Sequence, residues 1–294
     1  MVKIEKYHGT GNDFVVVDAG ENVPDKRQFA RELCDRESGL SHPEGRRSGA
    51  DGVLFLAPDA GATPPRVEMT LVQPDGSTAA MCGNGARCAA DWAARFVRNR
   101  RDDPAAEELV VDTPAGTRRA TVHGDGDVTV EMGVPAFDPA EVPVRGDEPL
   151  VEREVAGQTV TVVNTGVPHA VAFVDDVSDV AVEDVAPDVR YADAFPEGAN
   201  VTFASGRDDG GFDQRTYERG VESETDACGT GAVAVAAVAA RLGMAGHGEE
   251  MPVHPPGGRL VVTVGEDGST LTGPAVREFA DEVPASPAVD ATGD

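Results

Sequence analysis

The sequence predicts an α+β protein built from two similar domains, each a twisted sheet around one helix. Three features support this prediction. The chain has 294 residues, and at about 150 residues per domain this length favours two domains. Short runs rich in Val, Thr and Phe recur between Gly- and Pro-rich turns, as β-strands do. The third feature is a repeat, in which ACGTGAVAVAAVAAR (227–241) aligns with MCGNGARCAADWAAR (81–95).

The repeat places a cysteine before a helix twice. Aligning the two segments superimposes Cys82 on Cys228, and two glycines follow each cysteine at the same spacing. Each half also has a Gly-rich turn that enters an apolar strand, GTGNDFVVVD in the first and TGVPHAVAFVDD in the second. The helices are rich in alanine, so other backbone can approach them closely. We therefore expect a cleft between the two halves, with both helix starts facing it.

The elements of the first half follow from apolar runs and turn residues. The polar, Gly-rich stretch 37–51 predicts a loop, and PDGS (74–77) predicts a turn. We expect helices over 25–36 and 86–98, and strands over 2–7, 14–18, 52–56, 66–72, 109–113 and 118–122, with a further strand over 128–132 at the start of the second half.

The second half repeats this order. The Pro-, Asp- and Glu-rich stretch 135–150 predicts a surface loop, and 176–188 reads as an acidic patch. We expect a helix over 232–242 and strands over 159–163, 170–175, 200–204, 212–218, 260–264 and 275–282. The predicted domains are 1–122, to which a final strand near 275–283 returns, and 123–274, followed by a disordered tail over 284–294.

Charge limits the classes of partner. The chain carries 52 acidic and 25 basic residues, for a net charge of -27, so nucleic acid and anionic membranes are excluded as partners. Disorder is a poor explanation, because 40% of the residues are hydrophobic. In about 1 M salt the Debye length falls to about 3 Å, which screens such self-repulsion. We therefore expect a cytoplasmic protein from a halophile that keeps molar salt inside.

The cysteines indicate thiol chemistry. We expect no signal peptide, because MVKIEKYHGTGND has no apolar segment, and no membrane span, because no run of about 20 apolar residues occurs. Cys34 and Cys88 lie in apolar helical patterns and are expected to be buried packing residues. The four cysteines include no CxxC and no histidine pair at ligand spacing, so no metal site is expected.

Two cysteines at helix starts favour acid–base chemistry at carbon. Free N–H groups at a helix start bind a carboxylate and lower a thiol pKa from about 8.5. One such site would suit a nucleophile, a redox thiol or packing. Two related sites at one cleft suit a pair in which a thiolate removes an α-proton and a thiol returns a proton to the opposite face. That reaction inverts a stereocentre of a small amino-acid substrate.

Motifs over nearly the whole chain resemble the diaminopimelate epimerases, a family of PLP-independent amino-acid epimerases. The resemblance implies two pseudo-symmetric domains, each a twisted, mostly antiparallel sheet or barrel wrapped around a central helix. GNG after the first cysteine differs from the proline racemases, which usually carry a histidine there. The matching segments are HGTGNDFVVVD (8–18), GADGVL (49–54), PDGS (74–77), MCGNGARC (81–88), GVPHAV (166–171), EGANVTF (197–203), YERGVESETDACGTGA (217–232) and TGPA (272–275).

The resemblance also implies a reaction and a site. LL-2,6-diaminopimelate would be converted to the meso form in lysine biosynthesis, without a cofactor, with Cys82 and Cys228 as the two bases. It also suggests a homodimer as the oligomeric state. His169 would lie near the thiols as an auxiliary residue. Substrate contacts are implied for backbone N–H groups of Gly83, Asn84, Gly229 and Thr230, for the side chains of Asn12, Gln73 and Asn200, and for Glu218 and Arg219 at the distal ammonium and carboxylate.

Three positions depart from the family pattern and keep alternatives open. Many members have glutamine at Gly52, asparagine at Gln73 and asparagine at Val167, so the distal contacts and the exact substrate are open.

One alternative is a proline or hydroxyproline epimerase, although proline lacks distal charges for Glu218 and Arg219. Another is a dithiol redox protein, although no CxxC is present. A third is a non-catalytic amino-acid-binding protein.

Overall fold

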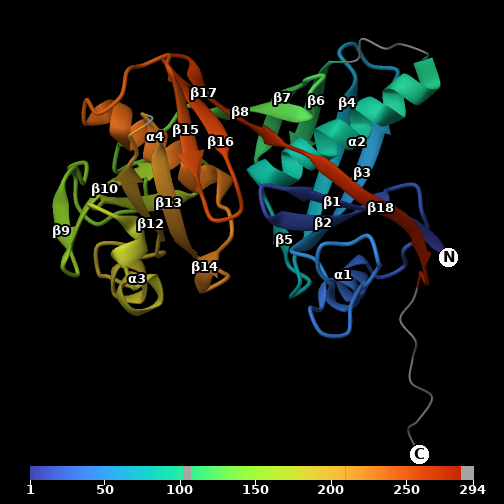
Figure 1. Ribbon diagram of the computed structural model, residues 1–294, viewed down its shortest axis with the longest axis horizontal. Coiled ribbons are helices and arrows are strands. Elements are labelled where there is room, and N and C mark those ends of the chain that lie inside the picture. Colours follow the sequence, from blue (N-terminus) through green and yellow to red (C-terminus); the bar gives the residue numbers. More distant parts are fainter. Residues whose placement is uncertain (102–106, 209, 286–294) are drawn as a thin grey trace, which may run out of the picture. The chain divides into compact units, whose positions relative to one another are not determined.

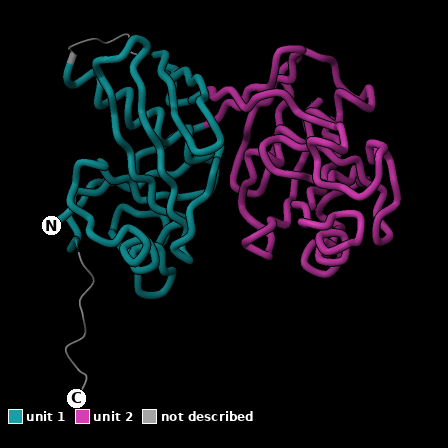
Figure 2. The backbone as a smooth tube through the Cα atoms, turned by 180° about the vertical axis from the view of Figure 1, so that it is seen from behind, with its two compact units in different colours: residues 1–128, 274–294 teal, residues 129–273 magenta. Residues whose placement is uncertain are grey.

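The computed structural model describes residues 1–101, 107–208 and 210–285. The chain divides into two units (Figure 2). Unit 1 consists of Met1–Val128 together with the C-terminal segment from Pro274, and unit 2 consists of Thr129–Gly273. The predicted tail lies outside the described residues from 286 onward.

Unit 1 is a mixed sheet packed on helix α2 (Gly83–Arg101) (Figure 1). The strand order is β18 (Val276–Val283), β1 (Val2–Gly9), β2 (Asn12–Asp18), β3 (Gly52–Asp59), β4 (Arg66–Val72), β6 (Glu108–Thr113) and β7 (Gly116–Val122). Neighbouring strands are antiparallel except for β2 with β3 and β4 with β6, which are parallel. A short strand, β5 (Thr78–Ala79), pairs with β4 and leads into α2.

Unit 2 wraps a second sheet around helix α4 (Gly229–Arg241). Its strand order is β10 (Gln158–Asn164), β11 (Pro168–Phe173), β12 (Asn200–Gly206), β13 (Phe212–Glu218), β15 (Glu250–His254), β16 (Leu260–Gly265), β17 (Gly268–Pro274) and β8 (Asp127–Gly133). β9 (Arg153–Val155) pairs with β10, and β14 (Ser223–Thr225) pairs with β13. Ala136, just after β8, forms an isolated antiparallel bridge with Asn164 at the end of β10.

The two units share one topology. The series β1–β2–β3–β4–β6–β7 and the series β10–β11–β12–β13–β15–β16 both pair antiparallel, parallel, antiparallel, parallel and antiparallel. Each has a helix after its second strand, α1 (Lys26–Cys34) in one and α3 (Val182–Arg190) in the other. Each has a short strand before its central helix. The predicted fold class, two pseudo-symmetric α+β halves around central helices, is therefore confirmed.

Small side chains allow each central helix to lie inside its sheet. In α4 every residue from Gly231 to Ala240 is buried, and all of them are Gly, Ala or Val. A Cβ on Gly231 would lie 2.6 Å from Gln214 Nε2 and 3.1 Å from Thr216 Oγ1, so only glycine lets the first turn of α4 pack this closely on β13. The small side chains of α4 thus fix the position of Cys228 at its start.

Several elements differ from the sequence prediction. Both central helices begin directly after their cysteines, at Gly83 and Gly229, three residues earlier than expected. The stretch 176–188, for which the sequence predicted only an acidic patch, also contains the start of α3 at Val182. The buried face of α3 is formed by Val182, Ala186 and Val189 at helical spacing. This apolar pattern is hard to recognise in the sequence because acidic residues lie between its members. The strands β5, β9, β14, β15 and β17 were also missed, because each is short or interrupted by Gly or Pro.

The other two cysteines lie in the interior of unit 1. Cys34 and Cys88 are buried free thiols, which confirms their predicted place in the core. No helix in the described part of the chain is long and apolar enough to cross a membrane.

Candidate active site

The two cysteines occupy equivalent places, one in each unit. Cys82 follows β5 and directly precedes α2, where it is partly exposed. Cys228 follows β14, is the N-cap residue of α4 and is buried. The first N–H groups of a helix have no intrahelical partner, so each cysteine stands beside free donors at the positive end of a helix dipole. Gly83 and Asn84 supply these donors in unit 1, and Gly229 and Thr230 supply them in unit 2.

The immediate surroundings of Cys82 are polar. The backbone N–H of Gly85 donates to Cys82 Sγ over 3.4 Å. A Cβ on Gly85 would lie 3.6 Å from that sulfur, which is an ordinary van der Waals contact. Asn84 Nδ2 donates to Asn12 Oδ1, and Asn12 Nδ2 donates to Asp51 Oδ2 over 3.2 Å. Two of the predicted substrate-binding residues, Asn12 and Asn84, therefore lie together, one on β2 and one on α2.

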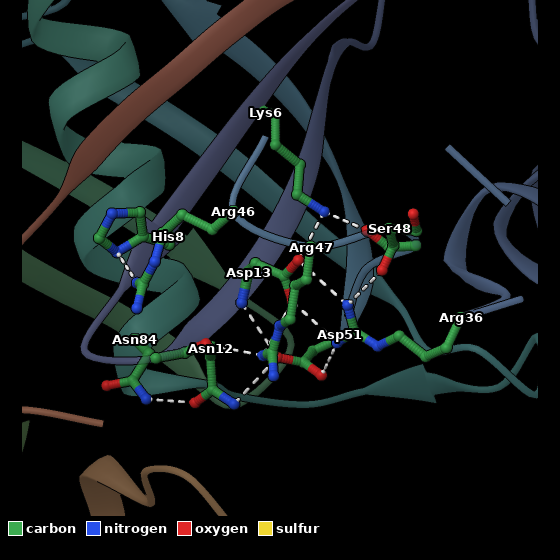
Figure 3. A network of polar contacts seen from close by, with 12 residues as sticks. Lys6, His8, Asn12, Asp13, Arg36, Arg46, Arg47, Ser48, Asp51 and Asn84 are labelled. Atoms are coloured by element: carbon green, nitrogen blue, oxygen red, sulfur yellow. Dashed lines mark hydrogen bonds and ion pairs between the residues drawn. The ribbon is translucent and has the colours of Figure 1, made fainter. Parts of the chain in front are cut away.

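An ion-pair network with a buried centre holds Asn12 in place (Figure 3). Lys6 on β1 and Asp13 on β2 form its centre, with Nζ 2.6 Å from Oδ2 and side chains that are 1% and 3% exposed. Burial alone raises the pKa of Asp13, but bonds from Arg36 and Lys6 outweigh it and hold that pKa well below its usual range. Asp13 therefore stays ionised next to the residue that carries a predicted substrate contact.

The loop before β3 completes the network. Arg47 Nη2 lies 3.1 Å from Asp13 Oδ1 and 3.1 Å from Asp51 Oδ2, and it donates to the carbonyl of Gly11 over 2.7 Å. Arg36 bridges the same two carboxylates. Asp51 also accepts the backbone N–H of Asp13 over 3.0 Å. Asp51 thus connects the loop to Asn12, and the sequence analysis did not single it out.

A buried arginine lies beside the first turn of α2. Arg87 is 0% exposed, and its Nη2 donates to Thr10 Oγ1 over 2.8 Å while Nε donates to the Pro274 carbonyl over 3.4 Å. A Cβ on Gly9 would lie 3.3 Å from Arg87 Nη2, from the Asn84 carbonyl and from the Pro274 carbonyl. A side chain in place of Gly9 would therefore press on the guanidinium and on both carbonyls. Arg87 was also missed by the sequence analysis.

In unit 2 a hydrogen-bonded chain starts at Cys228. Its Sγ lies 3.4 Å from Thr230 Oγ1, and Thr230 Oγ1 lies 3.0 Å from His169 Nε2. The other ring nitrogen, Nδ1, lies 3.1 Å from Thr202 Oγ1. As an N-cap, Cys228 makes no side-chain capping bond to α4. The Cys228 sulfur is thus in contact with the hydroxyl of Thr230, whereas the Cys82 sulfur accepts the backbone N–H of Gly85.

The network assigns the tautomer of His169. The Arg219 backbone N–H donates to Asn200 Oδ1 over 2.7 Å, so Asn200 presents its amide Nδ2 to His169 Nε2 at 3.2 Å. Because Nδ2 is a donor, Nε2 is the acceptor and the ring proton is on Nδ1, facing Thr202. Burial, followed by the positive charge of Arg219, lowers the pKa of His169 to about 3. His169 is therefore neutral near pH 7.

The two charged residues predicted for the distal substrate centre come at the end of β13. Glu218 Oε1 accepts from Thr225 Oγ1 over 2.5 Å. Arg219 Nη1 donates to the carbonyls of Glu197 at 3.2 Å and Gly198 at 3.4 Å. Within the described residues Arg219 forms no ion pair, and its Nε and Nη2 donors have no protein partner. These two donors form one edge of a guanidinium, as a bidentate carboxylate contact requires.

One predicted residue does not join these clusters. Gln73 lies in the turn after β4, where its Oε1 accepts from Ser77 Oγ over 3.0 Å. Gly52, a departure from the family pattern, has a packing reason, since a Cβ there would lie 2.6 Å from Leu71 Cδ1. In the described parts of the chain no group of three or more His, Cys, Asp or Glu side chains is arranged to hold a metal ion.

Comparisons with known proteins decide the family. The family model described as Diaminopimelate epimerase matches residues 4–137 and 161–278. A diaminopimelate epimerase from Methanothrix thermoacetophila is 43% identical over 285 residues, which cover 94% of each chain. One from Methanocella arvoryzae is 42% identical over 289 residues, covering 96% of each. The chain belongs to the diaminopimelate epimerase family. Membership confirms the predicted resemblance and the predicted enzyme class, an epimerase.

Solved structures support the fold. A probable proline racemase from Agrobacterium radiobacter K84 aligns with a TM-score of 0.65 at 18% identity, covering 99% of this chain and 95% of that one. A hydroxyproline epimerase from Agrobacterium vitis aligns with a TM-score of 0.61 at 18% identity, covering 95% of this chain and 91% of that one. At such identity these likenesses show the shared fold alone.

Proposed function

We propose that this protein converts LL-2,6-diaminopimelate to meso-diaminopimelate by a two-base mechanism, with Cys82 and Cys228 as the bases, as a step in lysine biosynthesis. The observation that carries the proposal is the equivalence of the two half-sites. Two topologically matched units each place a cysteine at the start of an alanine-rich helix. The named relatives that cover nearly the whole chain support the substrate.

The proton inventory of the reaction needs one thiolate and one thiol. The thiolate removes the α-proton, and the electron pair of the broken C–H bond remains on the α-carbon and its carboxylate. The thiol then gives its proton to the opposite face of that carbon, so the stereocentre inverts. Both sulfurs change protonation state once per turnover, and no net proton is gained or lost. The proposal requires that both half-sites close on one α-carbon.

Helix starts stabilise the charge that develops. The free N–H groups of Gly83, Asn84, Gly229 and Thr230 suit the α-carboxylate, on which negative charge accumulates as the proton leaves. These donors are fixed by the helices, so they need no reorganisation during the reaction. Asn12 and Asn200 would bind further polar groups of the substrate from the starts of β2 and β12.

Glu218 and Arg219 suit the distal amino-acid centre. The carboxylate would bind the distal ammonium, and the free edge of the Arg219 guanidinium would bind the distal carboxylate. Proline has neither distal charge, so it would leave both groups unmatched. Gln73 is the weakest of the proposed contacts, because its side chain is bonded within its own turn.

Variants at the cysteines test the proposal. We expect Cys82→Ala and Cys228→Ala each to abolish epimerisation of LL-diaminopimelate in a polarimetric or NMR assay, while thermal unfolding stays close to that of the parent. Cys88→Ala is the matched control, because it removes a buried thiol from the same helix as Cys82. Epimerisation at the parental rate by either active-cysteine variant would refute the two-base assignment.

We further propose that the protein works in molar salt in the cytoplasm of a halophile, as a homodimer. The net charge of -27 supports the salt requirement, and four cysteines without a CxxC motif suit a reducing compartment. We expect activity and unfolding temperature to rise together between 0.1 M and 2 M KCl. Full activity and unchanged melting in salt-free buffer would contradict the salt requirement, and a monomeric mass by light scattering would contradict the dimer.

A further inference from the structure

A chain of buried polar side chains leads from His169 to the start of α4. Thr202 Oγ1 lies 3.1 Å from His169 Nδ1 and 3.2 Å from Thr216 Oγ1. Gln214 Nε2 donates to Thr216 Oγ1 over 2.9 Å and to the carbonyl of Cys228 over 3.2 Å. Thr202, Thr216 and Gln214 are 0%, 2% and 1% exposed. We call these three residues the polar strut, because they connect the His169 ring to the backbone of Cys228.

The pairing of the strands lines up the polar strut. Thr202 on β12 is the direct partner of Thr216 on β13, and Gln214 lies two residues before Thr216. His169 on β11 pairs with Asn200, two residues before Thr202. Residues two apart in a strand face the same side of a sheet, so the ring and the strut lie on one face. That face packs on α4.

The two units can be compared position by position. The last residue of β14, Thr225, pairs with Thr216 and lies three residues before the cysteine of unit 2. The last residue of β5, Ala79, pairs with Leu71 and lies three residues before the cysteine that precedes α2. Leu71 in unit 1 therefore occupies the place that Thr216 occupies in unit 2.

Apolar side chains fill the matching places in unit 1. Starting from Leu71, the registers of β4 with β3 and of β3 with β2 give the other matches. The four matches are Phe14 for His169, Leu54 for Thr202, Leu71 for Thr216 and Met69 for Gln214. All four unit 1 residues are buried. The fold therefore accepts an apolar set at these places, whereas unit 2 has polar residues that bond to one another.

The polar strut has a cost that an apolar set avoids. In the part of the chain that the structure describes, Gln214 Oε1 is buried and has no hydrogen-bond partner. A buried carbonyl without a partner is destabilising, and apolar groups of the same shape can replace bonded polar groups without loss of stability. Packing alone therefore does not account for the strut. Its two ends lie at a ring and at a backbone carbonyl of the unit 2 half-site, which points to a role there.

We propose that Thr202, Thr216 and Gln214 are positioning residues of the unit 2 half-site. They hold the His169 ring in its Nδ1–H tautomer and tie that ring to the backbone of Cys228. The Thr202 hydroxyl accepts the Nδ1 proton. The Gln214 amide has two N–H groups and donates to two acceptors, the Thr216 hydroxyl and the Cys228 carbonyl. The proposal deepens the proposed two-base function and rests on it for its catalytic consequence.

The consequence for the site is a fixed ring beside Thr230. With the Nδ1 proton on Thr202, the other ring nitrogen of His169 stays an acceptor, and it lies 3.0 Å from Thr230 Oγ1. Thr230 Oγ1 in turn lies 3.4 Å from Cys228 Sγ. The polar strut therefore reaches Cys228 from two sides, through its carbonyl and through the hydroxyl next to its sulfur. Loss of the strut should lower kcat with little change in KM, because the strut acts through Cys228 and His169.

Nitrogen NMR of the histidine ring tests the proposal without substrate. Protein labelled with ¹⁵N-histidine is measured in 2 M KCl at pH 7, and the His169 signals are assigned by their loss in His169→Gln. We expect the Nδ1–H tautomer in the parent. Thr202→Val removes the acceptor of the Nδ1 proton, so the tautomer ratio should shift towards Nε2–H by about fivefold or more, because Thr230 can accept an Nε2 proton. Thr202→Ser keeps the hydroxyl and should retain the parental ratio.

Two further variants separate positioning from packing. Thr161→Val is the matched control, because Thr161 is another buried threonine of unit 2 and its hydroxyl accepts the Glu152 backbone N–H instead of bonding to the strut. It should leave the tautomer ratio and kcat at their parental values. Gln214→Met copies the apolar Met69 of unit 1 and should lower kcat about threefold or more, with KM nearly unchanged.

Failure of this proposal can be told apart from failure of the proposed function. A parental ring with its proton on Nε2, an unchanged ratio in Thr202→Val, or an equal shift in Thr161→Val would overturn the proposal. So would a parental kcat in both Thr202→Val and Gln214→Met. If Thr202→Val does not fold, the parental tautomer and the kcat of Gln214→Met still test it. If the parent does not epimerise diaminopimelate, the proposed function fails, whereas the NMR result still decides whether the strut holds the ring.

Discussion

Replacing Asp13 with asparagine should strongly destabilise unit 1. The change keeps the shape of the side chain but removes the charge that faces Lys6, whose side chain is 1% exposed. Breaking a buried ion pair by removing one partner costs about 3–5 kcal/mol, because the remaining charge stays buried without compensation. The two arginines that also contact Asp13 are 37% and 39% exposed, so water can solvate them after the change. The loss should therefore come mainly from Lys6.

The assay uses the single tryptophan of the chain. Trp92 lies on α2 in unit 1, and its Nε1 donates to Glu5 Oε1 over 3.0 Å. Its fluorescence during urea unfolding in 2 M KCl therefore reports on the unit that carries the substitution. Asp112→Asn is the matched control, because its partner Arg66 is 45% exposed, and an exposed pair contributes about 1 kcal/mol or less.

The expected result is a fall of about 3–5 kcal/mol in the free energy of unfolding for Asp13→Asn. High salt should not abolish it, because buried pairs are screened little. The folded-state pKa of Asp13 lies below its unfolded value, so its stabilisation is present above about pH 4 and is lost as pH falls below that. Asp13→Asn should lack this part of the acid dependence. A loss no larger than that of Asp112→Asn would refute the reasoning.

Three further predictions concern the thiols and His169. Thr230→Val removes the hydroxyl between Cys228 and His169, so kcat should fall about tenfold or more with little change in KM. Thr230→Ser, which keeps the hydroxyl, should restore kcat. An unchanged kcat in Thr230→Val would show that the hydroxyl has no role. His169 should remain the neutral Nδ1–H tautomer from pH 5 to 8 by ¹⁵N NMR, and a midpoint near 6.5 would contradict its burial. Since its folded pKa of about 3 lies below the unfolded value, its contribution to stability should be lost as pH falls from about 6.5 towards 3. Burial raises the pKa of Cys34 to about 12 and also raises that of Cys88, so neither should be alkylated at pH 8 until urea unfolds the protein; labelling of the folded state would argue against their place in the core.

The central helices were predictable because their pattern is local and occurs twice. Alanine at helical spacing after a cysteine and two glycines indicates a buried helix, and both are found. The helix α3 was missed because it has as many acidic residues as apolar residues on its buried face, and because Pro187 lies inside it. The short strands were missed because their pairing depends on longer neighbours. β14 has three residues and forms only beside β13.

The candidate site was predictable only where the residue type itself indicates chemistry. The cysteines and the Glu218–Arg219 pair could be singled out in this way. Arg87 could not, because an arginine on a helix is normally exposed, and only the packing of α2 against Gly9 shows that its charge is buried. Asp51 is likewise one of 52 acidic residues, and its link to Asn12 depends on the pairing of β2 with β3.

The central claim, that two thiols exchange the α-proton of diaminopimelate, is tested most directly by deuterium exchange. Reduced protein in D2O with molar KCl and no added PLP would be given LL-diaminopimelate, L-proline and trans-4-hydroxy-L-proline together, and NMR would follow each α-proton. The account predicts loss of the α-proton of diaminopimelate alone. Exchange in proline would overturn the substrate, and no exchange in any of the three, with folded protein and free thiols, would contradict the two-base chemistry itself.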